Sequence, residues 1–283
     1  MKRLTGYTVL FALFLVFGAA SAGQAADKKL ELAYVEWSCA TASIHVVEAV
    51  LEDKLGYDVD LTSVSAAAMW QALATGDVDG LTTAWLPVTH GHYLDKVGKD
   101  VVDLGPNCEG AAIGLVVPDY VTIDSIEELN ANAAKFDKEI IGIDPGAGIM
   151  SKTEKALEEY DLDLNLMEGT GAMMTAILAD RIKNNQFVVV TGWTPHWKFA
   201  RWDLKYLEDP KNVYGGEEKI HTFVRKGLKE DHPEAYRFLD NFHWNLQEIG
   251  QVMGWNSEGT DPADSARRWI KENPDRVKEW LGN

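Results

Sequence analysis

Apolar and polar positions follow two periods along the chain, and each change of period marks the start of another expected element. Residues 30–36 alternate with the period of a strand, and apolar positions from 44 to 55 then recur at helical spacing before Gly56. Residues 59–63 return to a period of two. A strand, a helix and a second strand in this order predict a βαβ unit.

The same alternation continues up to Pro118. Residues 69–75 are expected to be helical up to Gly76, residues 80–85 extended, and residues 113–117 a short strand that Pro118 stops. A second cycle follows, in which Ser125 to Glu128 has the sequence of a capping box at a helix start. Further strands are expected at residues 139–143, 187–190 and 222–224, and helices from 148 through 157 and over 232–281, the last with breaks at Gly254, Pro262 and Pro274.

Strands that alternate with helices predict an α/β fold, and the two cycles around Pro118 indicate two lobes. If the chain crosses near residues 115–120 and returns near 221–227, lobe one is discontinuous. Lobe one then comprises residues 27–116 and 221–283, and lobe two comprises residues 117–220. Ligands of such architectures bind in the crevice between lobes, at the carboxyl ends of the strands.

Composition narrows the classes of function. The 283 residues carry 27 Lys and Arg against 44 Asp and Glu, a formal charge of −17, with 46% hydrophobic residues. This acidic balance argues against nucleic-acid binding, which needs clustered basic residues to displace counterions. The length suits about two domains with cores of their own. Ten Trp are unusual and indicate either heavy packing or a binding surface.

The first 26 residues read as a cleaved signal peptide. Lys2 and Arg3 precede an apolar run over residues 7–20 and a small-residue stretch over residues 20–26. No Cys stands near the cleavage point, so a lipid anchor is not expected, and the mature chain is expected to be soluble and periplasmic. Export to an oxidising compartment would permit a disulfide between Cys39 and Cys108, but two separately buried thiols are an equal alternative.

Catalytic and metal-binding signatures are absent from the sequence. The seven His include no His-x-x-x-His pair, and the two Cys do not form Cys-x-x-Cys. His90 and His92 come closest, but they lack carboxylate or Cys neighbours. No nucleophile elbow or phosphate-binding loop occurs. We therefore expect no metal, no cofactor and no enzymatic activity.

The turn Asp144-Pro145-Gly146-Ala147-Gly148 joins an expected strand to an expected helix. Glycines at such a turn allow the amides of Gly148 and Ile149 to face an anion, and the helix N-terminus adds partial positive charge. A carboxylate fits this position. A tight turn that merely closes a βα unit is an equally good reading of the same residues.

Three Trp follow expected strands and so fall at the rim of the expected crevice. They are Trp37, Trp85 and Trp193. Aromatic faces attract poorly hydrated cations such as quaternary ammonium groups, which have no N–H to donate. A zwitterion with an onium head and a carboxylate tail would use both the Trp cage and the glycine turn, with His90 as a further donor. Four other Trp read as core packing and three stay unassigned: Trp70, Trp244, Trp269 and Trp280, and Trp197, Trp202 and Trp255.

Four separated motifs closely resemble the glycine betaine substrate-binding proteins of ATP-driven importers. They are Leu32-Ala33-Tyr34-Val35-Glu36-Trp37, Ala84-Trp85-Leu86-Pro87-Val88-Thr89-His90, Ile143-Asp144-Pro145-Gly146-Ala147-Gly148-Ile149-Met150 and Gly192-Trp193-Thr194-Pro195-His196-Trp197. The resemblance implies a two-lobed periplasmic-binding-protein fold of type II that closes on its ligand and delivers it to an ABC permease and its ATPase.

The resemblance also implies roles for six residues. Trp37, Trp85 and Trp193 would box the trimethylammonium group, and Gly148, Ile149 and His90 would hold the carboxylate. The protein is then expected to act as a monomer on glycine betaine, proline betaine or dimethylsulfoniopropionate, with choline disfavoured because it lacks a carboxylate. A ligand-sensing receptor for the same compounds and, further off, an enzyme acting on a quaternary amine are the alternatives.

Overall fold

The computed structural model describes residues 28–282. The expected signal peptide, residues 1–26, lies outside the described residues. Among the helices that are described, none is both long and apolar enough to span a membrane.

Within the described residues, nine strands join into one mixed sheet in the order β2-β1-β3-β9-β4-β7-β5-β6, with β8 beside β4. The strands are β1 Lys29–Tyr34, β2 Asp58–Ser63, β3 Gly80–Leu86, β4 Val101–Pro118, β5 Glu139–Ile141, β6 Asn165–Met167, β7 Val190–Thr194, β8 Leu204–Tyr206 and β9 Glu218–Arg225.

Helices flank both ends of this sheet. The α-helices are α1 Ser38–Leu55, α2 Ala66–Thr75, α3 Gly91–Val97, α4 Leu129–Asn132, α5 Gly148–Glu159, α6 Gly171–Lys183, α7 Lys198–Arg201, α8 Leu228–Asp231, α9 Pro233–Asn241, α10 Leu246–Ser257, α11 Pro262–Glu272 and α12 Pro274–Leu281. Short 3-10 turns are Gly98–Asp100, Ile126–Glu128 and Ala133–Phe136.

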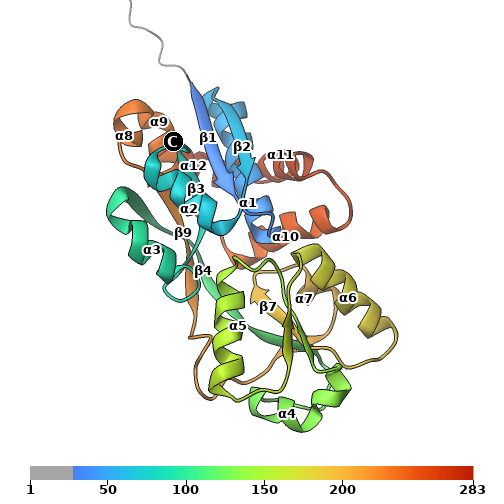
Figure 1. The fold of residues 1–283 in the computed structure, drawn as a ribbon. Helices are drawn as coiled ribbons and strands as arrows, with labels where there is room; N and C mark the ends of the chain where they lie inside the picture. Colours follow the sequence, from blue (N-terminus) through green and yellow to red (C-terminus); the bar gives the residue numbers. More distant parts are fainter. Residues whose placement is uncertain (1–27, 283) are drawn as a thin grey trace, which may run out of the picture.

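The fold has two lobes, as the alternation of strands and helices predicted. Lobe one contains β1 to β3 with α1, α2 and the C-terminal helices, and lobe two contains β5 to β7 with α4 to α7 (Figure 1). In lobe one β1 pairs in parallel with β2 and β3, and in lobe two β5 pairs in parallel with β6 and β7. Each lobe therefore directs the carboxyl ends of its parallel strands towards a common crevice.

The 18-residue strand β4 connects the lobes, and β9 pairs antiparallel with its first part. β4 pairs with β9 from Val101 to Ala111 and then with β7 from Ala112 to Val116. The expected short strand at residues 113–117 is only the last part of β4. The first part of β4 was not predicted, because bulges break its period of two. Gly105 and Gly110 adopt positive φ there, and the register shifts.

Two other expectations need correction. The strand expected at residues 187–190 begins only at Val190 and runs to Thr194, because an apolar run reports burial without fixing which of its residues pair. Gly254 lies inside α10 and does not break it, whereas Pro262 and Pro274 do stand at the starts of α11 and α12.

The expected helix caps and packing Trp are confirmed. Gly56 and Gly76 end α1 and α2 in left-handed conformation, and Ser125 and Glu128 form the capping box. The four Trp read as core are buried: Trp70, Trp244, Trp269 and Trp280. Trp255 is one of the unassigned three. The Arg268 Cζ atom lies 3.9 Å from the centroid of its ring, so Trp255 takes part in a surface cation–π contact.

Candidate functional site

A pocket between the lobes brings all six predicted site residues together. It contains about 320 Å³ of empty space and is lined by Trp37, Cys39, Trp85, Thr89, His90, Ile113, Ile143, Ala147, Gly148, Ile149 and Trp193. The wall is mostly apolar, and it contains few polar groups at defined places, which is the usual character of a small-molecule site.

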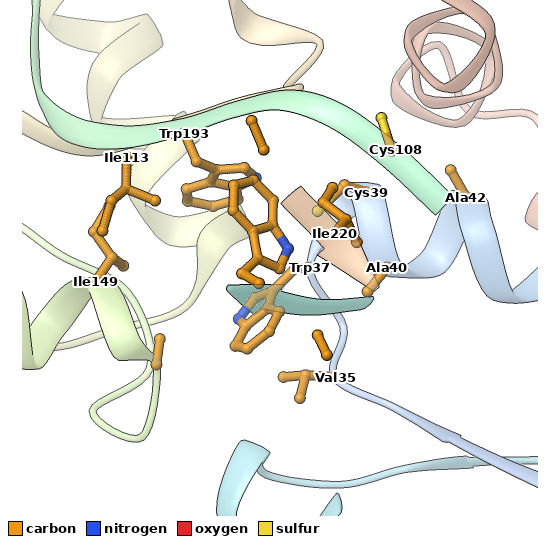
Figure 2. Packing of buried hydrophobic residues seen from close by; sticks show 14 of the residues in the cluster. Val35, Trp37, Cys39, Ala40, Ala42, Cys108, Ile113, Ile149, Trp193 and Ile220 are labelled. Atoms are coloured by element: carbon orange, nitrogen blue, oxygen red, sulfur yellow. The ribbon is translucent and has the colours of Figure 1, made fainter. Parts of the chain in front are cut away.

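The three indoles reach the pocket from three different strands or strand ends. Trp37 stands just before α1, Trp85 lies near the end of β3, and Trp193 lies in β7 of the other lobe. Their side chains are almost fully buried, with 7%, 3% and 5% exposed. Trp37 and Trp193 lie around a common space with Ile113 and Ile149 (Figure 2). Lobe one thus contributes two indoles and lobe two the third.

Trp37 is held by groups from both lobes. Its indole Nε1–H donates to both carboxylate oxygens of Asp144 at 3.1 Å, and the His90 ring stacks on it with centroids 5.6 Å apart. Burial raises the pKa of Asp144, and the Trp37 N–H partly opposes this rise. The bond between Trp37 and Asp144 crosses the crevice and fixes the orientation of one wall of the cage.

His90 offers the pocket an unused donor. The Trp85 backbone N–H donates to His90 Nδ1 at 3.1 Å, so Nδ1 is the acceptor and Nε2 carries the proton. Burial, with a smaller contribution from His92, lowers the His90 pKa to about 3, and the ring is neutral at physiological pH. Its Nε2 is buried and has no hydrogen-bond partner among residues 28–282. A buried donor without a partner is costly unless a ligand supplies the acceptor.

The N-terminus of α5 provides two more donors. No side chain caps this helix, and the backbone N–H groups of Gly148 and Ile149 make no hydrogen bond within the described part of the chain. These groups carry the positive end of the helix dipole. Together with His90 Nε2 they form a neutral set of donors that suits a carboxylate.

Gly148 is required by the close approach of the two lobes. A Cβ at this position would lie 2.1 Å from the Thr89 carbonyl oxygen, which is far inside van der Waals contact. A Cβ on Gly146, two residues earlier, would meet nothing within 4 Å. Tyr93 adds another contact across the crevice, because its hydroxyl donates to the Gly146 carbonyl at 2.9 Å. The lobes are therefore in close contact around the pocket.

Glu218 fixes the segment that carries His90, and sequence reasoning missed it. This fully buried carboxylate accepts the Val88 and Thr89 N–H groups at 2.8 Å each, and the Thr89 hydroxyl as well. Glu218 lies at the start of β9, about 130 residues away along the chain, so no local pattern links it to the site. Asp144 was quoted in a motif, but its bond to Trp37 had no sequence signal either.

Cys39 lines the pocket as a thiol. Cys39 and Cys108 are both free and buried, so the structure contains the separate thiols rather than the disulfide. Burial raises the pKa of each to about 12, which keeps both protonated and poorly nucleophilic. Across the described residues there is no group of three or more His, Cys, Asp or Glu that could hold a metal ion.

Comparisons with known proteins identify the family and the fold. The family described as OpuAC, the substrate binding domain of ABC-type glycine betaine transport systems, matches residues 28–272. A glycine betaine/carnitine transport binding protein, GbuC of Listeria monocytogenes serotype 1/2a (strain 10403S), is 52% identical over 144 residues, which is 50% of this chain and 48% of that protein. The match therefore spans about half the length of this curated relative.

Two solved structures extend the comparison over nearly the whole chain. Lactococcal OpuAC in its closed, liganded conformation with glycine betaine superposes with a TM-score of 0.86 at 44% identity, covering 90% of this chain and 100% of that one. A choline binding protein of an ABC transporter, in complex with choline, gives a TM-score of 0.84 at 27% identity, covering 90% and 92%. One fold thus serves a zwitterion in the first protein and a monocation in the second.

Proposed function

Because the chain belongs to the OpuAC family of substrate-binding domains of ABC-type glycine betaine transport systems, we propose that it captures glycine betaine or a related onium zwitterion for an ATP-driven importer. The observation that carries this proposal is the pairing of three indoles with a separate set of neutral donors in one pocket. The indoles suit a methylated cation, and the donors suit a carboxylate.

In the proposed complex Trp37, Trp85 and Trp193 surround the onium head. The carboxylate accepts hydrogen bonds from the Gly148 and Ile149 amides and from His90 Nε2. Proline betaine and dimethylsulfoniopropionate offer the same two poles, so we place them in the same ligand class. The pocket holds no activated nucleophile, because its one thiol, Cys39, stays protonated. The ligand is therefore bound and released unchanged.

The two lobes are proposed to move as units and to close on the ligand. Lobe one would comprise residues 27–116 and 221–283 and lobe two residues 117–220, with β4 and β9 as the connecting strands. Ligand that touches both lobes favours the closed state by its differential affinity for that state. The closed monomer would then present the ligand to the permease outside the cytoplasm, after export by the signal peptide.

Titration of the purified protein with glycine betaine tests the proposal. We expect a saturable change in Trp fluorescence and a matching heat in calorimetry, because the indoles become desolvated by the ligand. Glycine is the control ligand: it has the same carboxylate, but its ammonium N–H groups would find no acceptors among the indoles. Binding of glycine as tight as that of glycine betaine, or no saturable signal with either, would refute the assignment.

A further inference from the structure

Lys198 is a buried cation that the proposed binding scheme does not use. It opens α7, its side chain is fully buried, and its Nζ has no hydrogen-bond partner among residues 28–282. Lysines are rarely buried without a paired carboxylate, because desolvation of the ammonium is costly. The position of this amine therefore calls for an explanation beyond packing.

The amine lies directly behind the cage. Lys198 Nζ stands over the Trp193 ring, 4.4 Å from its centroid, and 5.3 Å from the centroid of Phe199. Lys198 is not among the residues that line the pocket, whereas Trp193 is. The same indole therefore lines the pocket and has the Lys198 amine over its ring.

Among residues 28–282 no carboxylate forms an ion pair with this amine. The titratable groups that act on it are Cys39 from α1 and His196 from its own segment, whose ring also packs edge-on against Trp193. Burial lowers the pKa of Lys198 to about 7, and Cys39 opposes the shift. Both protonation states are thus accessible near neutral pH.

We propose that Lys198 makes the pocket select ligands by their net charge. Its ammonium next to Trp193 repels an onium monocation more than it repels an onium zwitterion. A second cation on the same indole competes for the negative potential of the ring. A zwitterion offsets this repulsion with its own carboxylate, whereas a monocation does not. The inference rests on the proposed function, and it addresses what the shared fold leaves open, since that fold serves glycine betaine in one relative and choline in another.

Replacement of the amine by an isosteric neutral side chain tests the inference. In Lys198→Met we expect the affinity for tetramethylammonium to rise on the order of tenfold at pH 6, from two unit charges about 9 Å apart at an effective dielectric constant of about 20. The affinity for glycine betaine should change much less. Lys155→Met removes an exposed lysine of α5 in the same lobe and is the matched control, with both affinities expected to stay as in the wild type.

The pH profile provides a second measurement that needs no variant. In the wild type, tetramethylammonium should bind more tightly at pH 9 than at pH 6, because Lys198 loses its charge over this range, while the glycine betaine affinity stays nearly constant. In Lys198→Met the tetramethylammonium profile should flatten. Asp144 is the acidic group at the cage, and His90, His196 and Cys39 are the other titratable groups there, none of which changes in the variant. Any slope that these groups cause therefore persists in the variant.

The outcomes are separable from those of the proposed function. If glycine betaine fails to bind the wild type, the proposed function is wrong. If glycine betaine binds, but the ratio of the two affinities is the same in wild type and Lys198→Met, Lys198 does not select ligand charge. If the ratio of the tetramethylammonium affinity to the glycine betaine affinity in the wild type is constant from pH 6 to pH 9, the inference is overturned even if the variant does not fold.

Discussion

Two of the three indoles of the proposed cage are contacted by different neighbours. Trp37 is tied by its N–H to Asp144, whereas Trp193 is covered by the Lys198 amine and by the edge of His196. The indole N–H of Trp193 has no hydrogen-bond partner in the described part of the chain. The contacts of Trp193 come from its own lobe and do not depend on the other lobe, whereas the bond between Trp37 and Asp144 forms across the crevice.

Removal of one indole tests the cage at this scale. Trp85→Ala and Trp193→Ala should each weaken glycine betaine binding by about 1 to 2 kcal/mol or more, because a desolvated onium loses one of its aromatic faces. Calorimetry gives the dissociation constants. Trp255→Ala is the control, since this indole pairs with Arg268 at the surface and should leave the affinity unchanged. Wild-type affinity in both cage variants would contradict the assigned cage.

Residue types and their positions at strand ends were enough to find the six candidate residues, because aromatic and glycine signals are local. The supporting residues were not predictable in the same way. Glu218 is distant in the sequence from Val88 and Thr89, whose backbone N–H groups it accepts. The burial of Lys198 results from tertiary packing. Their roles depend on contacts between distant segments, which periodicity does not encode.

At the scale of elements, the start of α5 faces the segment that joins β3 to α3. Glu218 holds this segment through two backbone N–H groups, and the Thr89 carbonyl then meets Gly148 at the helix start. The free amides at the start of α5 and the His90 donor are thus brought together by two elements from different lobes. The space between these elements admits no side chain at position 148.

A matched pair of glycine substitutions tests this contact. Gly148→Ala should lower glycine betaine affinity at least tenfold, on the order of 1.4 kcal/mol, because its Cβ would lie 2.1 Å from the Thr89 carbonyl and would force the lobes apart. Gly146→Ala in the same turn meets nothing within 4 Å and should bind as the wild type does. Titration calorimetry on both decides. Equal affinities would show that the lobes close without this contact.

The types of the expected elements were predictable from the sequence, but the bounds of β4 and β7 were not, and the short strands β6 and β8 and the helices α3 and α6 were not expected. The helix ends at Gly56 and Gly76 were predicted from local signals, and both are confirmed. The long β4 was read only in its last part, because bulges at Gly105 and Gly110 interrupt the alternation where it crosses between lobes. The strand that crosses from one lobe to the other is thus the element whose pattern is least regular.

At the scale of the whole molecule, the fold buries ionisable groups that stay uncharged. His90 and His196 are both buried, and burial lowers the pKa of His90 to about 3 and that of His196 well below its usual value. A protein that buries neutral histidines binds fewer protons folded than unfolded in the range where free histidine titrates. The stability they contribute is therefore complete above about pH 6.5 and is lost as the pH falls towards the folded-state values.

We therefore expect the free energy of unfolding to rise with pH between 4.5 and 6.5, by up to about 1.4 kcal/mol per pH unit for each of the two histidines. Lys198 adds an alkaline part with the same sign: its pKa of about 7 lies below the usual 10.5, so stability is gained as the pH rises from 7 to about 8.5. Above that pH the two buried thiols, whose pKa values are raised to about 12, contribute with the opposite sign. Denaturant unfolding across this range measures both parts.

His196→Asn should remove about half of the acid slope, while His243→Gln, an exposed histidine, should leave it. Lys198→Met should abolish the alkaline part alone. A free energy of unfolding that does not change between pH 4.5 and 6.5 would mean that burial in the folded state does not keep these histidines neutral.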